Sequence, residues 1–494
     1  MMRKIFSLFI LCMMFFSVCC ASEKTDQSIY RRKIQKNHRL IILNSGIASL
    51  EKRLELIERA QESIELETFV FNTDRAGKII LKKLIEKAQE GVQVRLLLDH
   101  YMIGSKIDPY VAWALKKEGI EARFYNSVSK VRLVRYQYRT HRKFMLVDGK
   151  EVILGGRNIA DEYFDLDHDY NFVDRDVWIE GEIVKDILAT FNDLWSHAWS
   201  QEISKPATPN FNNDLRYLRN RRSSSGANSQ YQRKLHHWQK NTLRAKKLVS
   251  EIKNKNFKLK RIRRLGKEKL FFEKEITCPE ITFVSDLPFE KSEKKETKIL
   301  KDIIFNQMLK ARKRVVIDSP YFIINKESKK VMQSLTKKRD KKVELLTNSL
   351  YSTDAIYVAT VFYKNLKLWI DRGLQTYIYS GVILPGEIPI DQKVETSRWG
   401  THSKSYIFDN AFMIGSFNMD PRSYVFSLET GIFCKGAPQA TQDLYDNIKK
   451  RMKNSYFLED EKTYKEMRFK RVSFVKKIGY ALLKYPSLWM KNLL

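Results

Sequence analysis

Apolar and polar positions recur along the chain with two different periods, which predict strands and helices in alternation. Between residues 63 and 71 apolar and polar side chains alternate, as expected of a half-buried strand, and residues 77–90 follow with a helical pattern. An apolar strand at 91–99 completes a β-α-β unit. The same order returns later, with strands at 314–317 and 343–347 around a helix. The sequence therefore predicts an α/β protein built from two repeats of one plan.

The repeats and the changes in composition divide the chain into five segments. They are an N-terminal export segment at 1–21, a first lobe at 40–200, a basic insertion at 201–275, a second lobe at 276–452 and a basic tail at 453–494. A chain of 494 residues is longer than one hydrophobic core usually serves. Its length therefore agrees with two lobes.

Positive charge is concentrated in the insertion and the tail. The formal net charge of +32 predicts attraction to polyanions, such as anionic lipid or nucleic acid. The insertion between residues 216 and 270 contains 19 Lys or Arg and two acids. This pattern fits a helical insertion that touches anionic headgroups, and equally a solvated connector.

The tail contains an apolar stripe with helical spacing. Its members are Val472, Val475, Ile478, Leu482 and Tyr485, with basic residues on either side. The pattern is typical of an amphipathic helix at a membrane interface, and also of a helix packed on the second lobe.

The N-terminus has the features of an export signal. A short positive region precedes an uncharged apolar run at 5–18, which ends before Cys19, Cys20 and Ala21. Cleavage after Ala21, lipid attachment to a cysteine and a retained anchor all remain open. The protein is therefore expected to be periplasmic, membrane-associated or secreted. Beyond this segment only Cys278 and Cys434 remain, so one disulfide can form but cannot be assigned.

One constellation of polar residues occurs twice. The first copy is His141-x-Lys143-x4-Asp148, followed after six residues by Gly155-Gly156-Arg157-Asn158. The second is His402-x-Lys404-x4-Asp409, followed after five residues by Gly415-Ser416-Phe417-Asn418. A single copy arises easily by chance, whereas two copies with one spacing indicate a shared chemical purpose.

The residue types in each copy suit a phosphodiester. Residues two apart in a strand share a face, so each histidine is expected to lie beside the lysine of its copy. Lys143 and Lys404 would hold the non-bridging phosphate oxygens, and Asn158 and Asn418 would donate further hydrogen bonds.

The small residues of the second motif are expected to support phosphate binding. Glycine at 155, 156 and 415 would let the backbone approach the substrate closely, and the Ser416 hydroxyl would donate another hydrogen bond. Asp148 and Asp409 fall at the strand ends near a turn, where a structural role is expected. No Cys or His cluster has metal-ligand spacing, so neither a metal nor another cofactor is expected.

Two histidines are needed because a phosphodiester must lose a poor leaving group. One imidazole attacks phosphorus and the other protonates the leaving alcohol. Two downstream acids, Asp176 for the first copy and Glu429 for the second, are expected to accept the other ring N–H of the histidine in their own copy. Ordinary surface salt bridges are the alternative for these acids.

These residues resemble the phospholipase D superfamily, whose two-copy members form one active site between two similar lobes. Segments 155–164, 174–177, 347–354 and 415–423 are similar to bacterial cardiolipin synthases, especially the C type. The resemblance implies two phospholipase D-like lobes, each a mixed central sheet flanked by helices, packed with pseudo-two-fold symmetry around one active site. The sequence departs from the family pattern at residues 99–100 and 405–406.

The resemblance also implies an activity, namely phosphatidyl transfer through a phosphohistidine. His141 would be the nucleophile and His402 the general acid, in an order that is open to exchange. The implied substrates are phosphatidylglycerol and a second phosphatidylglycerol or phosphatidylethanolamine, at an anionic membrane surface. Water as the acceptor would instead make a hydrolytic phospholipase D.

A secreted nuclease is a third hypothesis. Nucleic acid ranks lower as a substrate because superfamily nucleases are usually short single-copy chains that dimerise. Both copies here lie in one chain, so a monomer suffices for the site, and the oligomeric state stays open.

Overall fold

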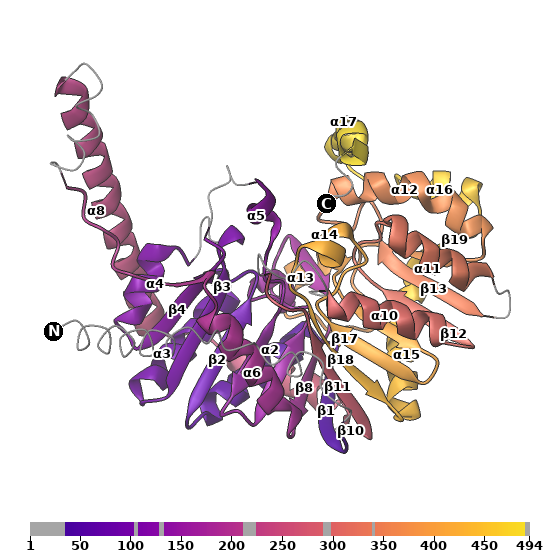
Figure 1. Ribbon diagram of the computed structural model, residues 1–494, viewed down its shortest axis with the longest axis horizontal. Helices are drawn as coiled ribbons and strands as arrows, with labels where there is room; N and C mark the ends of the chain where they lie inside the picture. The colour runs from indigo at the N-terminus through magenta and orange to yellow at the C-terminus, as the bar shows by residue number, and fades with distance from the viewer. Residues whose placement is uncertain are drawn as a thin grey trace, which may run out of the picture.

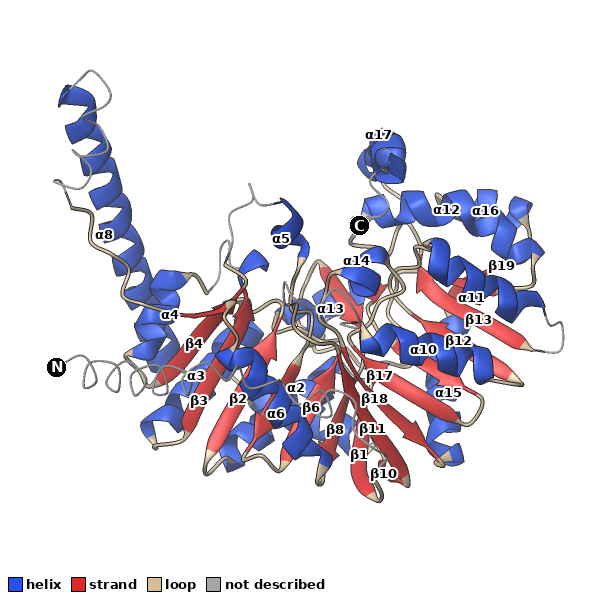
Figure 2. Ribbon diagram, in the orientation of Figure 1, coloured by secondary structure: helices blue, strands red, loops and turns tan. Residues whose placement is uncertain are grey.

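The computed structural model describes residues 35–102, 107–127, 133–210, 224–289, 298–337 and 341–489. Two mixed β-sheets stand next to each other, and helices cover them (Figures 1 and 2). The predicted α/β class with two similar lobes is confirmed. The expected export segment at 1–21 lies outside the described residues.

The first sheet has nine strands within the described ranges. In spatial order they are β10 (Glu275–Cys278), β1 (His38–Leu43), β8 (Asp176–Glu180), β6 (Glu151–Gly155), β5 (Phe144–Val147), β2 (Ser63–Thr68), β3 (Gln93–Asp99), β4 (Ile120–Tyr125) and β9 (Ser200–Glu202). β2, β3 and β4 are parallel neighbours, and the other pairs are antiparallel.

The second sheet repeats this order with eight strands in the same described part of the chain. They are β11 (Glu280–Ser285), β18 (Thr430–Lys435), β17 (Ala411–Gly415), β16 (Ser405–Phe408), β12 (Arg314–Asp318), β13 (Lys342–Asn348), β14 (Gln375–Tyr379) and β19 (Ser455–Leu458). Each matches one strand of the first sheet from β1 to β9 in position and direction. The predicted duplication is therefore visible strand by strand.

The lobes are joined at the middle by a shared core and a small sheet. β7 (Tyr170–Val173) of the first lobe pairs in parallel with β15 (Arg398–Thr401) of the second. One apolar cluster contains residues of both sheets, among them Leu146 and Ile407, so neither sheet closes this core alone. The chain therefore positions the two motif copies relative to each other through continuous packing.

Helices surround both sheets. In the first lobe they are α2 (Gly46–Arg59), α3 (Arg75–Gln89), α4 (Pro109–Lys116), α5 (Leu133–Gln137) and α6 (Ile183–Ser196), with short 3₁₀ turns η2 (His100–Met102) and η3 (Asp161–Tyr163). In the second they are α10 (Ile299–Lys310), α11 (Lys326–Lys337), α12 (Ile356–Asp371), α13 (Gln392–Thr396), α14 (Pro421–Val425), α15 (Pro438–Lys453), α16 (Glu461–Met467) and α17 (Phe474–Trp489). Among the described residues no helix is both long and apolar enough to cross a bilayer.

The basic insertion forms two helices that dock on the first lobe. α8 (Ser224–Asn254) packs on α3 and α4, where Ala245, Val249 and Ile252 are buried. α9 (Lys260–Phe271) packs on α2, where Ile262 and Leu265 are buried. The insertion is therefore not a purely solvated connector, because each of its helices buries an apolar side against the first lobe.

Two lobe boundaries differ from the prediction. β10 pairs with β1, so the chain belongs to the first sheet until Cys278, and the second lobe begins with β11. β19 pairs with β14, which extends the second lobe past residue 452 to Leu458. A disulfide joins Cys278 in β10 to Cys434 in β18, with 5.9 Å between the Cα atoms. This bond fastens the first sheet to the second.

Candidate active site

Each motif histidine lies on an extended segment that crosses to the opposite lobe. The His141 N–H donates to the Leu428 carbonyl at 2.9 Å, and the His402 N–H donates to the Val173 carbonyl, also at 2.9 Å. His141 and Lys143 precede β5, and His402 with its lysine precedes β16 in the same way. The backbone therefore brings both copies to the boundary between the lobes.

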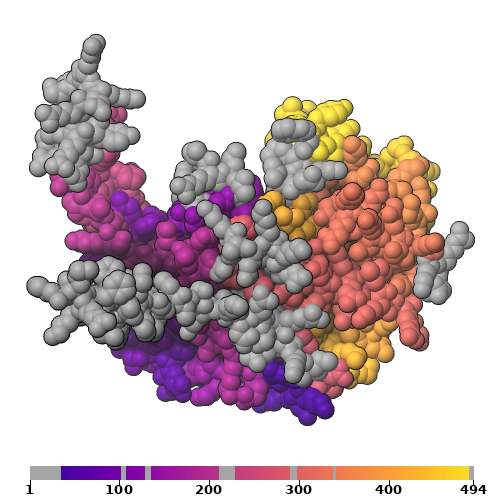
Figure 3. Space-filling model, viewed as in Figure 1, coloured from indigo at the N-terminus to yellow at the C-terminus, as the bar shows by residue number. Residues whose placement is uncertain are grey.

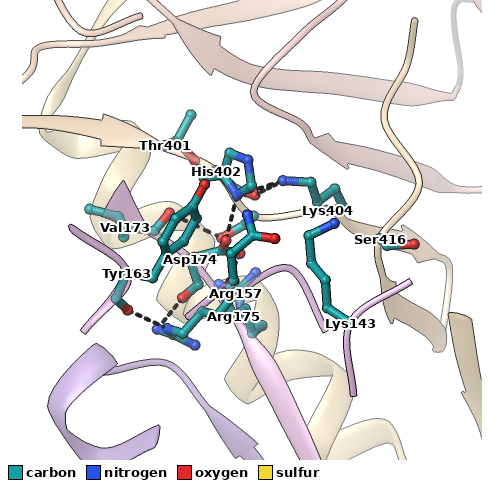
Figure 4. Close-up of polar contacts among 12 residues, drawn as sticks. Lys143, Arg157, Tyr163, Val173, Asp174, Arg175, Thr401, His402, Lys404 and Ser416 are labelled. Carbon is teal, nitrogen blue, oxygen red and sulfur yellow. Dashed lines mark hydrogen bonds and ion pairs between the residues drawn. The ribbon is translucent and has the colours of Figure 1, made fainter. Parts of the chain in front are cut away.

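Each histidine is bound by an acid of the other lobe. The Glu429 carboxylate accepts from His141 Nδ1 at 3.0 Å. The Asp174 carboxylate accepts from His402 Nδ1 at 2.6 Å (Figure 4). The expectation that each acid orients the histidine of its own copy is therefore wrong, and Asp176 is not one of the two acids.

Strand register explains why Asp174, and not Asp176, corresponds to Glu429. Gly155 pairs with Asp176 in the first sheet, and Gly415 pairs with Gly431 in the second. Each orienting acid thus stands two residues before the partner of the motif glycine. Each acid lies just before its strand, β8 or β18, where the chain still faces the opposite lobe.

Asp176 contributes to the fold instead. Its carboxylate lies 3.0 Å from the Arg53 guanidinium and accepts from the Ser49 hydroxyl at 2.7 Å. All three side chains are buried, and the Asp176 carboxylate also lies 3.5 Å from the Arg157 guanidinium. An unpaired charge at this depth would be costly, so the acid and the arginines depend on one another.

The motif lysines are buried beside the histidines. Lys143 Nζ donates to the His141 carbonyl at 2.6 Å, and Lys404 Nζ donates to the His402 carbonyl and lies 2.7 Å from His402 Nδ1. Burial lowers the pKa of Lys143 to about 7, and the charge of Lys404 contributes. Burial likewise lowers the pKa of Lys404 to about 8. Both cations are therefore poorly solvated, and a bound phosphate would stabilise their charged forms.

The histidines are held in the neutral form before substrate binds. Burial lowers the pKa of His141 to about 4, against the opposing charge of Glu429. Burial and the charge of Lys404 lower the pKa of His402 to about 3. For Glu429, burial raises the pKa, but the pairing with His141 and the charges of Lys143 and Lys298 outweigh it, and the pKa falls to about 2. The acids are thus ionised and act as acceptors, which places the proton of each imidazole on Nδ1 and leaves Nε2 as the basic nitrogen.

The two asparagines occupy equivalent places with different contacts. Asn158 Oδ1 accepts from the Val70 N–H at 3.1 Å. Asn418 Oδ1 is buried and has no hydrogen-bond partner within the described part of the chain. One end of the Asn418 amide is therefore free for a ligand.

The motif glycines stand where a side chain would collide with the neighbouring chain. A Cβ at Gly156 would overlap the Asp174 carboxylate, and a Cβ at Gly415 would overlap the Thr430 carbonyl. Gly155 is equally closed, because a Cβ there would overlap Asp176. The absence of a side chain thus serves strand contact, and the approach of these glycines to the substrate stays a prediction.

Ser416 also has a different partner from the one expected. Its hydroxyl donates to Glu429 Oε2 at 2.5 Å and accepts from the Thr430 N–H at 3.0 Å. Ser423 donates to the other oxygen of Glu429 at 2.7 Å. The two hydroxyls therefore fix the carboxylate that orients His141, and the Ser416 hydroxyl is not free to hold phosphate.

The motif aspartates close equivalent turns. Asp148 and Asp409 each adopt a φ of 53° after their strand. Asp148 accepts three consecutive backbone N–H groups at residues 61–63, and Asp409 accepts three at residues 312–314. The structure places both aspartates at the turn, as the spacing predicts. Their hydrogen bonds go to backbone N–H groups and not to the histidines.

Aromatic rings that the motif spacing did not reveal line both histidines. Phe69 lies with its centroid 5.4 Å from the His141 ring, and Phe172 lies 4.7 Å from the His402 ring. Tyr163 meets the His402 ring edge-on at 5.2 Å. Phe69 follows β2, Tyr163 ends η3 and Phe172 lies in β7, so the rings come from separate elements and no local pattern reveals them. They shield the imidazoles from water.

The positions that depart from the family pattern serve the fold. Asp99 is buried, accepts from the Thr140 N–H at 2.9 Å and pairs with Arg139 at 3.3 Å. It thereby supports the segment that carries His141. Ser405 accepts from the Arg175 guanidinium at 2.7 Å. Within the described ranges no three His, Cys, Asp or Glu residues are grouped as metal ligands would be.

The family model for "Cardiolipin synthase, PLD-like domain" matches residues 54–195 and 304–453, which include both motif copies. The chain belongs to this family. It is thus an enzyme of the phospholipase D superfamily, built for phosphatidyl transfer.

Relatives of this cardiolipin synthase-like enzyme extend over most of its length. A Helicobacter pylori J99 protein described as uncharacterized is 29% identical over 427 residues, which are 83% of this chain and 79% of that protein. Cardiolipin synthase C of Escherichia coli K12 is 25% identical over 423 residues, 79% of this chain and 80% of the relative. The phosphatidylserine synthase structure from Haemophilus influenzae Rd KW20 has a TM-score of 0.62 at 15% identity, and covers 96% of this chain and 99% of that one. The last comparison shows a shared fold.

Proposed function

We propose that this enzyme forms cardiolipin by moving a phosphatidyl group from phosphatidylglycerol to a hydroxyl of a second phospholipid through a phosphohistidine. The observation that carries the proposal is the pair of histidines, each bound at Nδ1 by a carboxylate of the other lobe. Two oriented imidazoles match the two roles that a double displacement requires, a nucleophile and a proton carrier. One imidazole is occupied by phosphorus while the other moves the proton.

The first step forms a nitrogen–phosphorus bond. Nε2 of one histidine attacks the phosphorus of the donor lipid, and the bond from phosphorus to the headgroup oxygen breaks. The other histidine, as imidazolium, gives its proton to that oxygen. The pKa of both histidines is low before substrate binds, and the negative phosphodiester would raise it by stabilising the imidazolium.

The second step reverses the roles. The now neutral imidazole takes the proton of the acceptor hydroxyl, whose oxygen attacks phosphorus while the nitrogen–phosphorus bond breaks. Lys143 and Lys404 would balance the phosphate charge throughout. A half-turn of the Asn418 amide would place its NH₂ group at the unpartnered position and add a donor. By analogy with the family, His141 is the nucleophile and His402 the acid.

Product analysis tests this proposal. Purified full-length protein is incubated with vesicles of phosphatidylglycerol and phosphatidylethanolamine, and the lipids are identified by mass spectrometry. Cardiolipin is expected from the native chain and not from His141→Ala or His402→Ala. If phosphatidic acid forms without cardiolipin, the enzyme is a hydrolytic phospholipase D and the transfer proposal is wrong. Cleavage of added DNA with unchanged lipids would favour a nuclease.

We further propose that the chain works outside the cytoplasm. The apolar run at 5–18 and the Cys278–Cys434 disulfide support this, because structural disulfides persist in oxidising compartments. A C-terminal fusion to a reporter that folds only when exported is expected to be active. It should lose activity when residues 1–21 are deleted, and equal activity without them would contradict export by this segment.

A further inference from the structure

The C-terminal helix α17 presents apolar side chains to solvent. The exposed members, here called the α17 apolar face, are Phe474, Val475, Ile478, Leu482 and Tyr485. At 3.6 residues per turn they fall within an arc of about 100°. Phe474 is 76% exposed and Leu482 71%. Of the stripe seen in the sequence, only Val472, just before the helix, is buried.

The opposite side of α17 attaches the helix to the second lobe. Lys476 Nζ donates to the Tyr351 carbonyl at 3.0 Å and to the Thr353 carbonyl at 2.7 Å. Tyr480 is buried, with its ring 6.3 Å from that of Tyr363 on α12. A surface helix normally turns its apolar side to the core. Here Lys476, Tyr480 and Leu488 make the attachment, and the α17 apolar face stays outside.

The positive charge around the α17 apolar face favours an anionic partner. From residue 467 to the C-terminus the chain has no acid, and besides the attaching Lys476 it has six basic residues, namely Arg468, Lys470, Arg471, Lys477, Lys484 and Lys491. A second copy of the chain would bring like charges together at this face, whereas an anionic bilayer would neutralise them. An apolar arc bordered by lysines is the arrangement that binds the boundary between lipid headgroups and acyl chains.

The helix is attached to the part of the lobe that borders the active site. The loop that accepts the Lys476 hydrogen bonds continues to Asp354. The Asp354 carboxylate accepts from the Tyr321 hydroxyl at 2.9 Å, and its charge raises the pKa of Lys404 against burial. The next residues begin α12, where Tyr357 is exposed. Figure 1 shows α17 on the same side of the molecule as α14 and α5, and Figure 3 shows it protruding there.

Partly exposed groups from both lobes lie near the first histidine. The Arg422 guanidinium of α14 lies 5.6 Å from the ring of Tyr101, which is partly exposed. Tyr101 stacks on Phe69 at 6.2 Å, and Phe69 contacts His141. A row of aromatic rings thus leads from the surface near α14 to the first histidine.

We propose that the α17 apolar face enters an anionic bilayer and holds the side of the molecule that carries α14 and Tyr101 against the lipid surface. The inference rests on the proposed function, because only a lipid substrate gives this placement a purpose. Phospholipid would then reach the histidines along the aromatic row without crossing water. Docking itself is measurable without any turnover.

Binding to vesicles tests the docking. Full-length protein is mixed with vesicles of phosphatidylglycerol and phosphatidylcholine, and hydrogen exchange is followed by mass spectrometry. Exchange within 474–485 is expected to slow with anionic vesicles and not with phosphatidylcholine alone. Because this readout is local, membrane binding by residues 1–21 does not mask it.

Matched triple variants identify the surface. Phe474→Ser, Ile478→Ser and Leu482→Ser together are expected to weaken anionic-vesicle binding through this face on the order of 100-fold, because three apolar side chains lose their burial in lipid. The control variant replaces three exposed apolar side chains elsewhere. It combines Leu243→Ser, Phe271→Ser and Phe272→Ser, whose side chains are 69%, 85% and 73% exposed. The control is expected to bind as the native chain does.

A soluble substrate separates docking from chemistry. Hydrolysis of bis(p-nitrophenyl) phosphate by the α17 triple variant is expected to stay within about two-fold of native, while turnover of vesicle lipid falls in proportion to binding. The docking proposal would be wrong if anionic vesicles left hydrogen exchange in α17 unchanged, or if the control variant lost as much vesicle binding as the α17 variant. It would also be wrong if raising the protein concentration slowed exchange in α17 without lipid. Protection of α17 in a native chain that forms no cardiolipin would support docking and overturn the proposed function.

Discussion

The Asp174→Asn substitution is expected to lower kcat/KM for phosphatidyl transfer about 10²-fold in a protein that still folds. The Asp174 carboxylate lies 2.6 Å from His402 Nδ1 and is fully buried, so water does little to screen its charge. Asparagine keeps the size and one acceptor but loses the charge that stabilises the imidazolium. A charge-assisted hydrogen bond contributes about 1.5–3 kcal/mol, and about 2.7 kcal/mol corresponds to a hundredfold change in rate.

The same substitution should move the alkaline limb of the pH profile. The Asp174 charge is the largest influence that raises the pKa of Lys404 against burial. Without it the pKa of Lys404 falls, so the lysine loses its charge at a lower pH. The kcat/KM profile is therefore expected to decline earlier on the alkaline side. A merely structural defect would lower the rate at all pH values without moving this limb.

Asp176→Asn is the matched control, two residues away. It removes the charge partner of buried Arg53 and does not touch a histidine, so we expect a loss of about 3–5 kcal/mol in unfolding free energy. The molecules that remain folded should keep nearly native turnover. Thermal unfolding and lipid turnover are measured on both variants. A folded, inactive Asp176→Asn beside an active Asp174→Asn would refute the assignment.

Three further predictions concern charge, the disulfide and a turn. Because the pKa values of Lys143 and Lys404 lie at about 7 and 8, both lose charge as pH rises through this range, and KM measured from pH 6 to 9 should increase. Replacing Cys278 and Cys434 by serine should lower the unfolding free energy by about 2–5 kcal/mol in thermal denaturation, toward the upper end because the bond closes a loop of 156 residues. Asp409→Ala should cost about 2–3 kcal/mol in urea unfolding by freeing three backbone N–H groups, with turnover per folded molecule unchanged.

The duplicated fold could be predicted because it repeats in local patterns. The alternation of strands and helices appears in both halves, and the motif spacing indicates both histidines and both turn aspartates. Each of these features depends on neighbours within a few residues. Local physics therefore suffices for the lobes and for the identity of the chemical groups.

The exchange of acids between lobes could not be predicted in the same way. His141 and Glu429 are 288 residues apart, and His402 and Asp174 are 228 apart. Asp174 and Asp176 differ only in strand register, since Asp176 stands opposite a motif glycine, as Gly431 does in the second copy. Aligning the two halves at that strand would have matched Asp174 with Glu429. Which lobe each acid serves depends on how the lobes pack.

The apolar stripe of the tail shows the same limit. The helical period predicts a stripe, but the direction that it faces depends on contacts made elsewhere. Lys476 and Tyr480 fix α17 by the opposite side, and Ile478 therefore stays at the surface. The insertion is the converse, because its basic composition conceals the buried side chains that dock α8 and α9 on the first lobe.

The stereochemistry at phosphorus tests the central claim most directly. Phosphatidylglycerol made chiral at phosphorus with oxygen isotopes is converted by the native enzyme, and the configuration of the product is determined by phosphorus NMR. Two in-line displacements, by a histidine and then by the acceptor hydroxyl, each invert the centre, so the account predicts net retention. Net inversion would mean a single displacement without a phosphohistidine and would contradict it.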